Sequence, residues 1–184
     1  GEAKIKSPYC VAVNGKEITT RSIIIATGAR PLVPLIPGLE NINYLTSDTI
    51  WSLTELPKRL LVVGGGAIGC ELSQAFNNLG SNVTQVDLSS RILPREDEEV
   101  SALVMDRFKA EGIAVLTDHR LNKFEIVDGE NYMEAHHKGD TVRIPFDAVL
   151  LAIGRKPNVD GFGLESLNMP IEPQGTIQVN EYLQ

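Results

Sequence analysis

The sequence has 184 residues, of which 42% are hydrophobic and 22% charged, a composition typical of a globular protein with one domain or one domain and part of a second. Its formal net charge of −7, without any basic block, argues against binding to nucleic acid or to anionic lipid. No apolar run is long enough to span a bilayer and the first residues lack a signal-peptide pattern, so we expect a cytoplasmic protein.

The first forty residues are predicted to form short strands and then a linker. Two β-like segments flank Asn14-Gly15, a pair that favours the two-residue turn of a β-hairpin. A third apolar run, residues 22–25, is also expected to be a strand. Three prolines and a glycine follow within residues 31–38, and they indicate an extended linker and a domain boundary.

From residue 47 onward, helices and strands are predicted to alternate. A short helix is expected over 47–53, capped by Ser47 or Asp48, with Trp51 as a core anchor. The elements after it are strand 60–63, helix 67–79, strand 82–86, helix 97–111 and strand 113–116. A glycine follows each of the two longer helices, where a left-handed cap is expected. The second of them is expected to bury an apolar face that consists of Val100, Leu103, Val104 and Phe108.

Residues 121–147 are predicted to form an antiparallel three-stranded meander, because three β-like segments are separated by Asp128-Gly129 and by a Lys-Gly-Asp turn. The apolar run 148–153 has the character of a buried strand and stops at Gly154. This succession predicts an α/β fold, a Rossmann-like three-layer nucleotide-binding domain with an antiparallel β-meander insertion.

Residues 64–69, GGGAIG, satisfy the pattern GxGxxG between a predicted strand and a predicted helix. The required glycines suit a tight turn at Gly64, close approach of a pyrophosphate at Gly66 and close helix packing at Gly69. The N–H groups of the helix start supply an anion site. An acid, Asp87, stands eighteen residues after Gly69 at the tip of the next strand. This combination predicts a bound dinucleotide rather than a simple bend.

Asp87 favours NAD(H) over NADP(H). A carboxylate accepts hydrogen bonds from the free hydroxyls of the adenosine ribose, whereas it repels the additional phosphate of NADP. The next three residues are Leu88, Ser89 and Ser90, so the first cation after the strand is Arg91. Arg91 leaves open the alternative of NADPH, and a solvated strand end is the alternative role of Asp87.

Several segments, in the same order, resemble the pyridine nucleotide-disulfide oxidoreductases, in the branch of dihydrolipoamide dehydrogenase and mercuric reductase. The matching segments cover essentially the whole chain: GEAKI, SIIIATGARP, PGLE, TSD, LPKRLLVVGGGAIGCEL, NVTQVDLSSRILPREDEEV, DAVLLAIGRKPN and GTIQVNEYLQ. In that family a nicotinamide cofactor reduces FAD, which passes electrons to a cysteine pair and onward to an acceptor. The resemblance therefore implies the NAD-binding domain of a flavin-dependent disulfide or mercuric-ion reductase.

The resemblance also implies that the NAD domain is inserted into an FAD domain. Residues 1–40 then resemble a remnant of the FAD domain, 41–170 the NAD-binding domain, and 171–184 the return to the FAD domain. The fold is thus expected to be flanked by incomplete FAD-domain segments. The family's first glycine motif, its CxxxxC pair and its dimerisation domain have no match in the sequence. We therefore expect a central fragment of a homodimeric enzyme, inactive alone and without bound FAD.

The resemblance assigns NAD-binding roles to Gly64, Gly65, Gly66, Ala67, Ile68, Gly69, Glu71, Asp87, Leu121 and Gly154. Glu71 resembles a family glutamate that supports hydride transfer through a flavin-side lysine, although in this chain it is expected to be a helix-start acid. Leu121 resembles the apolar residue under the adenine. Gly154 resembles the glycine along which the nicotinamide end passes, with a simple turn as its alternative role. Contacts to FAD in the complete enzyme are implied for Ala3, Thr27, Gly28 and Ala29.

Two points stay open at this stage. A stand-alone NAD-binding sensor without redox chemistry is the alternative function, and the electron acceptor cannot be chosen from an NAD domain.

Metal binding is not predicted, because His136 and His137 are neighbours on a strand and point to opposite faces. Cys10 and Cys70 are expected to be reduced thiols.

Overall fold

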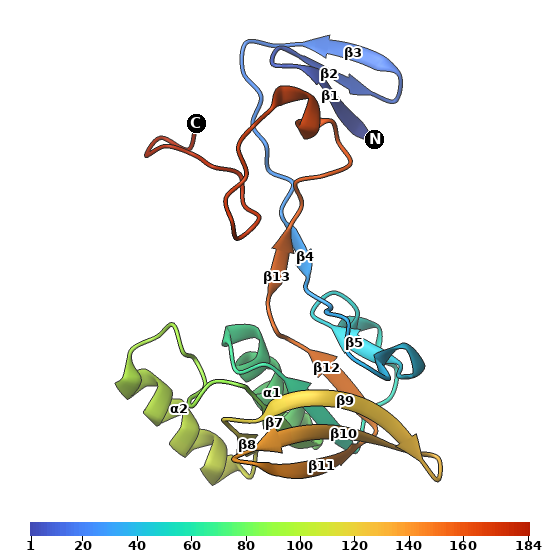
Figure 1. The fold of residues 1–184 in the computed structure, drawn as a ribbon, viewed down its shortest axis with the longest axis vertical. Helices are drawn as coiled ribbons and strands as arrows, with labels where there is room; N and C mark the ends of the chain where they lie inside the picture. Colours follow the sequence, from blue (N-terminus) through green and yellow to red (C-terminus); the bar gives the residue numbers. More distant parts are fainter. The chain divides into compact units, whose positions relative to one another are not determined.

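The computed structural model describes residues 1–184, which divide into two compact units (Figure 1). The smaller unit contains residues 1–30 and 155–184, and the larger one residues 31–154. The proline-rich segment 31–38, expected to be a linker, therefore belongs to the larger unit. The larger unit begins ten residues before the boundary expected at residue 41 and ends sixteen residues before the boundary expected at residue 170.

An antiparallel three-stranded sheet forms part of the smaller unit. Its strands are β1 (Ala3–Ser7), β2 (Cys10–Val13) and β3 (Lys16–Thr19), in the order β1-β2-β3. The predicted hairpin is confirmed, because β2 and β3 pair directly across its turn. The two turn residues, Asn14 and Gly15, have φ of 50° and 81°, which matches the twist of the flanking strands.

The run 22–25 is not a strand, contrary to the prediction. Ile24 is 90% exposed and no strand pairs with this segment. An apolar run becomes a strand only where a neighbouring strand completes its hydrogen bonds. The pairing begins later, where β4 (Ala29–Pro31) pairs with β13 (Arg155–Pro157), and a short 3-10 helix, η3 (Leu164–Leu167), follows β13.

A parallel five-stranded sheet forms the centre of the larger unit. Its strands are β5 (Tyr44–Thr46), β6 (Arg59–Val63), β7 (Asn82–Val86), β8 (Ala114–Leu116) and β12 (Ala148–Leu151). They lie in the order β5-β12-β6-β7-β8. All of them except the edge strand β5 were predicted. Side chains alternate along β6, so that Leu60 and Val62 pack on one side and Leu61 and Val63 on the other.

Two helices cover one face of this sheet (Figure 1). They are α1 (Ala67–Leu79) and α2 (Glu98–Glu111). The predicted left-handed caps are confirmed, since Gly80 and Gly112 follow the helices with φ of 108° and 83°. Both helix ends are thus determined by a residue that has no Cβ to clash in this conformation.

The predicted apolar face of α2 is confirmed only in part, since Val104 packs against the core beside Phe108 and the other two residues do not. Phe108 is buried as expected, but Val100 and Leu103 are 44% and 71% exposed. The second buried position is Ser101, whose hydroxyl donates to the carbonyl of Ile92 at 2.6 Å. Residues 101 and 108, two turns apart, therefore lie on the same buried face of the helix.

The predicted meander covers the other face of the sheet (Figure 1). It consists of β9 (Arg120–Val127), β10 (Glu130–His137) and β11 (Asp140–Phe146), in the antiparallel order β11-β10-β9. Phe124 and Phe146 meet edge to face with ring centroids 5.8 Å apart, in a core shared with the sheet. The three-layer α/β fold is therefore confirmed, with the parallel sheet between the helices and the meander.

The first predicted helix is a single 3-10 turn, η2 (Ile50–Ser52), and a threonine rather than Ser47 or Asp48 stands at its N-cap. Trp51 is not a core anchor, because it is 73% exposed and its indole N–H donates to the Ser47 carbonyl at 2.7 Å. Ile50, at 1% exposure, fills the core instead. In a turn this short only one side chain faces the sheet. A second 3-10 turn, η1 (Leu39–Asn41), precedes β5.

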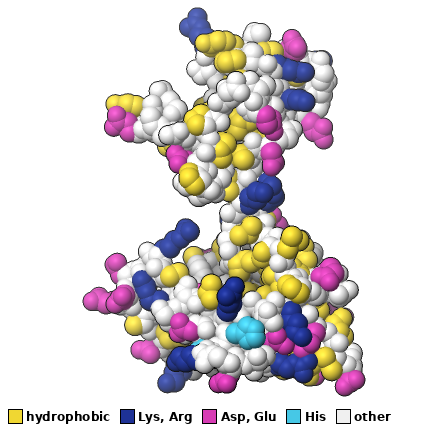
Figure 2. All heavy atoms as spheres, viewed as in Figure 1, with side chains coloured by type: hydrophobic (Ala, Val, Ile, Leu, Met, Phe, Trp, Pro, Cys, Tyr) yellow, Lys and Arg dark blue, Asp and Glu magenta, His cyan; other side chains and the backbone are white.

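Charged side chains of both signs are mixed on the visible face of the molecule (Figure 2). On the face shown in Figure 2, Lys and Arg side chains are interspersed with Asp and Glu side chains. That face therefore offers no extended basic surface for nucleic acid phosphates. No helix of the structure has both the length and the apolar character needed to cross a membrane.

Candidate functional site

The glycine turn, residues 64–69, lies at the carboxyl end of the central strand. The chain order reverses there, because β7 and β8 lie on one side of β6 and β12 on the other. The Gly64 N–H donates to the Val86 carbonyl at 2.8 Å, and the Ala152 N–H donates to the Val63 carbonyl at 2.7 Å, so the tips of three strands are joined. In open α/β sheets, ligands bind outside the strand ends at such a switch point.

Two glycines of the turn are required by contacts within the protein. Gly64 has φ of 121°, and a Cβ there would stand 2.3 Å from the Ala152 carbonyl oxygen. A Cβ on Gly69 would stand 2.1 Å from the Gly64 carbonyl oxygen. Gly64 therefore permits the tight turn and Gly69 the close packing of α1 on the turn, the two tasks expected from the pattern.

Gly66 has no such internal reason to be a glycine. Its backbone is extended, with φ of −76°, and a Cβ there would meet no atom within 4 Å. α1 begins at the next residue, and no side chain caps its N-terminus. The N–H groups of a first helical turn have no partners inside the helix and carry the positive end of its dipole. The open side of Gly66 is thus bordered by unsatisfied donors, which suits an anionic group.

Asp87, directly after β7, reaches the glycine turn. One carboxylate oxygen accepts the Gly65 N–H, and the other accepts the Ser89 N–H at 2.6 Å. The backbone at Asp87 accepts the His119 N–H at 3.0 Å, which links it to the segment that leads into β9. The structure therefore brings Asp87 and the turn together, and the carboxylate anchors Gly65.

Arg91, the first cation after β7, is engaged within its own loop. Its guanidinium donates to the carbonyls of Leu93, Pro94 and Glu96 at 3.0–3.2 Å. Three acceptors around one guanidinium fix the direction in which its donors point. Arg91, the alternative partner for a ribose phosphate, is thus held by the loop 91–96.

The remaining residues expected at an NAD site lie on three different elements. Leu121 is on β9, partly buried against the core between sheet and meander. Gly154 follows β12 with φ of 126°, a conformation that favours glycine whatever passes beside it. Glu71 is exposed and lies in the second turn of α1, whose first turn holds no acid, so the expectation of a helix-start acid was wrong. The exposed Ala67 opens the helix beside the turn.

The residues expected to contact FAD lie in the smaller unit, on separate segments. Ala3 is on β1 and pairs with Val13. The segment 27–29 is held by Asn158, which accepts the Thr27 hydroxyl at 2.6 Å with its carbonyl and donates to the Thr27 carbonyl at 2.9 Å with its amide. The Asn158 N–H also donates to the Gly28 carbonyl at 3.0 Å. The segment that leads into β4 is therefore held in place by protein contacts alone.

Two residues that contact the turn were not predicted from the sequence. The side-chain amide of Gln85 donates to the Gly64 carbonyl at 2.9 Å, and the Leu93 N–H donates to the Gly65 carbonyl at 2.6 Å. Gln85 leaves a signal in the sequence, since it is a polar residue at an inward position of a strand. Leu93 leaves none, because its left-handed backbone, with φ of 49°, depends on the surrounding loop.

No cluster of three or more His, Cys, Asp or Glu side chains is placed to hold a metal ion. His119 and His137 stack with ring centroids 4.2 Å apart, and each directs Nδ1 toward a backbone carbonyl. Cys10 and Cys70 are both free. Burial raises the pKa of the Cys70 thiol, so this side chain stays a neutral S–H group.

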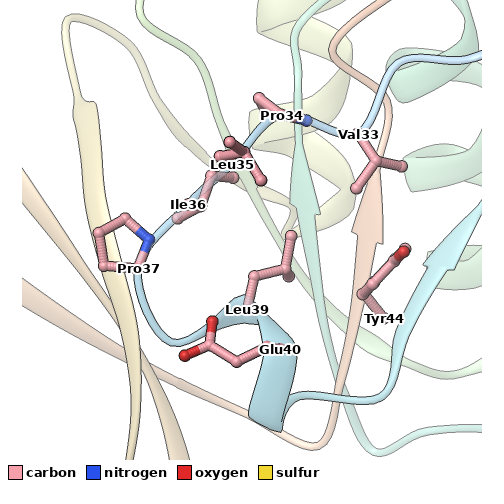
Figure 3. Close-up of a pocket in the computed structure, with 8 residues that line it drawn as sticks. All are labelled: Val33, Pro34, Leu35, Ile36, Pro37, Leu39, Glu40 and Tyr44. Carbon is pink, nitrogen blue, oxygen red and sulfur yellow. The ribbon is translucent and has the colours of Figure 1, made fainter.

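An open apolar groove lies in a different part of the larger unit (Figure 3). It has a volume of about 470 Å³ and is lined by Val33, Pro34, Leu35, Ile36, Pro37, Leu39, Glu40 and Tyr44. None of the residues expected to bind NAD or FAD lines it, and Glu40 is its only charged side chain. The lining therefore contains no Lys or Arg side chain to pair with the phosphates of a nucleotide.

Comparison with known proteins identifies relatives that match nearly the whole of this chain. It is 39% identical over 184 residues to a mercuric reductase of Staphylococcus aureus, a match that covers 100% of this chain and 34% of the relative. It is 37% identical over 189 residues to a dihydrolipoyl dehydrogenase of Thermus scotoductus, covering 98% of this chain and 40% of the relative. The chain thus spans about a third of the length of the mercuric reductases it matches.

Solved structures agree with these relatives. The HOCl-induced flavoprotein disulfide reductase RclA from Escherichia coli superposes with a TM-score of 0.84 and 28% identity, over 98% of this chain and 41% of that one. Its Cu(II) complex gives a TM-score of 0.86 and 26% identity over 100% and 42%. The family profile described as pyridine nucleotide-disulphide oxidoreductase matches residues 1–184. The chain therefore belongs to the pyridine nucleotide-disulphide oxidoreductase family.

Proposed function

We propose that residues 31–154 bind NADH and present its nicotinamide to a flavin held by the rest of a disulfide or mercuric-ion reductase. The observation that carries this proposal is the open side of Gly66. A glycine that no contact within the protein requires, next to an uncapped helix N-terminus, is what a diphosphate needs for close approach.

Each part of a dinucleotide can be assigned to residues around the turn. The backbone N–H groups from Gly66 to Gly69 would hold the diphosphate, and Asp87 would accept the hydroxyls of the adenosine ribose. A carboxylate has about four acceptor sites, so the two N–H groups that Asp87 already binds leave capacity for a ribose. Leu121 and Gly154 are proposed for the adenine and nicotinamide ends. Bound NADH supplies the hydride that reduces the flavin in this family.

The same contacts support NADH over NADPH. A ribose phosphate would stand near the negative charge of Asp87, and two like charges about 4 Å apart repel by about 1 kcal/mol in water. Arg91, the cation nearest in sequence, already binds three carbonyl groups of its own loop. Recruiting it for a phosphate would cost those hydrogen bonds.

The complete enzyme is proposed to be a cytoplasmic, FAD-containing homodimer. Its electron acceptor is proposed to be a disulfide or a mercuric ion, as the names glutathione reductase and mercuric reductase of two relatives suggest. Glu71 would take part only there, beside the flavin. These features rest on parts of the relatives that this chain does not span.

Titration of the purified 184-residue chain with NADH and with NADPH tests the proposal. We expect saturable binding of NADH, and NADPH binding that is weaker by about fivefold or more, the factor that 1 kcal/mol represents. Equal affinities would refute the role of Asp87. If neither nucleotide bound, the proposal itself would be wrong.

A further inference from the structure

Gln85 is a buried polar residue directly beneath the glycine turn. It has 0% exposure and lies two residues after Val83, on the side of β7 that faces the helices. Its side-chain nitrogen donates to the Gly64 carbonyl at 2.9 Å and to the Cys70 sulfur at 3.5 Å. Both amide protons of Gln85 are therefore directed at the turn and at the first turn of α1.

The hydrogen bonds continue from Cys70 to the next carbonyl of the turn. The Cys70 thiol donates to the Gly65 carbonyl at 3.5 Å, and the backbone N–H of Leu93 donates to the same oxygen at 2.6 Å. Gln85 thus holds the Gly64 carbonyl directly and the Gly65 carbonyl through the Cys70 thiol. Both glycine carbonyls are kept on the protein side of the turn.

One peptide group of the turn is held at both of its ends. The carbonyl of a trans peptide and the N–H that follows it point in opposite directions. Here the Gly64 carbonyl accepts Gln85, while the Gly65 N–H donates to Asp87. Two side chains of one strand region, two residues apart, therefore determine the orientation of this peptide plane.

The protein retains Gln85 at a cost. Its side-chain oxygen is buried without a hydrogen-bond partner. A buried acceptor without a partner destabilises the folded state, and an apolar side chain of similar length would avoid that loss. The hydrogen bonds that the Gln85 amide nitrogen donates to the turn and to Cys70 offset this loss of stability.

We propose that Gln85 is a positioning residue for the dinucleotide diphosphate. It keeps the two glycine carbonyls away from the ligand, so that only N–H donors from Gly66 onward face the phosphate oxygens. A carbonyl rotated to the ligand side would present a negative partial charge to an anion and weaken binding. The inference rests on the proposed function, because it concerns the same site.

The test compares Gln85→Met with the matched control Gln74→Met in the 184-residue chain. Gln74 is a glutamine on α1 whose amide binds Glu111 at 2.9 Å, away from the turn. For Gln85→Met we expect NADH affinity to fall about fivefold to tenfold, the effect of one lost hydrogen bond. Its unfolding midpoint should stay close to that of the parent, since the change removes one unpartnered acceptor and creates another at Gly64. Gln74→Met should bind NADH like the parent.

A second pair of variants tests the relay without altering Gln85. Cys70→Ser keeps a group that accepts from Gln85 and donates to Gly65, and Cys70→Ala keeps neither. We expect Cys70→Ser to bind NADH within about twofold of the parent and Cys70→Ala to bind several-fold more weakly. If Gln85→Met does not fold, this pair of Cys70 variants tests the positioning role in its place.

The possible results separate the two proposals. If the parent binds no NADH, the proposed function fails and this inference fails with it. If the parent binds and Gln85→Met matches it within twofold, only the positioning role is overturned. It is also overturned if Gln85→Met and Gln74→Met lose affinity alike, or if Cys70→Ser is as weak as Cys70→Ala.

Discussion

The three glycines at the required positions of the GxGxxG motif, Gly64, Gly66 and Gly69, differ in what surrounds each Cα. At Gly64 and Gly69 a side chain would meet backbone oxygens at 2.3 Å and 2.1 Å, distances that no rearrangement of a flexible side chain can relieve. At Gly66 a side chain would meet nothing in the protein. Replacement by alanine therefore separates the demands of folding from those of a ligand.

We expect Gly66→Ala to leave the thermal unfolding midpoint unchanged and to weaken NADH binding on the order of tenfold, because the new methyl group occupies the side open to the diphosphate. Gly69→Ala should instead destabilise the fold by about 1–3 kcal/mol, as overpacking does. Calorimetric unfolding and NADH titration of both variants make the comparison. A Gly66→Ala variant that binds NADH as the parent does would contradict the role given to the open side.

Asp87 anchors Gly65 and is proposed to bind the adenosine ribose, so its replacement should affect both the turn and nucleotide preference. We expect Asp87→Ser combined with Leu88→Arg to raise the ratio of NADPH to NADH affinity on the order of tenfold, since a repulsive charge is exchanged for an attractive one. Leu88 is 67% exposed, so an arginine fits there without strain. The absolute affinity for both nucleotides should fall, because Gly65 loses its carboxylate anchor. Leu88→Arg alone is the control, and an unchanged ratio in the double variant would show that Asp87 does not contact the ribose.

At the scale of elements, one arginine attaches the meander to the central sheet. Arg59, the first residue of β6, donates to Asp147 at 2.6 Å and to Glu130 of β10 at 2.6 Å. Asp147, between β11 and β12, also accepts the Arg59 backbone N–H at 2.8 Å. The three side chains are partly exposed, with 37–40% of their surface accessible, so solvent screens the charges and geometry limits their contribution.

This cluster makes stability depend on pH in a predictable direction. Arg59 lowers the pKa of Asp147, and the Tyr132 hydroxyl followed by Arg59 lowers that of Glu130. Depressed carboxyl pKa values stabilise the fold above the unfolded pKa of about 4, and that stabilisation is lost as pH falls through the folded values.

We expect Arg59→Met to lower the unfolding midpoint at pH 7 and to have a smaller effect near pH 3, because the stabilisation that comes from the lowered carboxyl pKa values decreases as pH falls below the unfolded pKa of about 4. Thermal unfolding at the two pH values measures this difference. Arg107→Met, which removes a single ion pair with Glu111 four residues along α2, should have the smaller effect at pH 7, because Arg107 is 67% exposed. An Arg59→Met deficit that is the same at both pH values would show that packing rather than charge accounts for it.

At the scale of the whole molecule, the larger unit is one continuous segment. Its two ends meet, since the Leu32 N–H donates to the Gly154 carbonyl at 3.0 Å. The smaller unit is built from the two segments that precede and follow it. Such an arrangement is typical of one domain inserted into another, because neighbouring ends require little change in the host.

A ligand held by one unit should protect that unit. At a free NADH concentration about a hundred times the dissociation constant, linkage stabilises the binding unit by about 2.7 kcal/mol, which slows exchange of its most protected amides about a hundredfold. We therefore expect NADH to slow hydrogen exchange in β6, α1 and β7, and to leave β1–β3 unchanged. Hydrogen-exchange mass spectrometry resolves these segments. Slowing in β1–β3 without slowing in β6 would place the nucleotide elsewhere.

Features that depend on neighbours within a few residues could be predicted from the sequence. The Asn14-Gly15 turn, the left-handed caps at Gly80 and Gly112 and the strand–turn–helix around residues 64–69 all follow from backbone conformations that glycine and asparagine adopt at low cost. The order of strands and helices likewise predicted the layers, because a sheet or helix with one apolar face has few ways to bury it.

Tertiary structure alone decided which side chains meet across the fold. Trp51, Val100 and Leu103 point outward, and residues 22–25 stay unpaired, because burial and strand pairing depend on partners that lie far away in sequence. The same holds for Gln85, which only the pairing of β6 with β7 brings to the glycine turn. Local pattern specifies conformation, whereas contact between distant residues exists only once the sheet has formed.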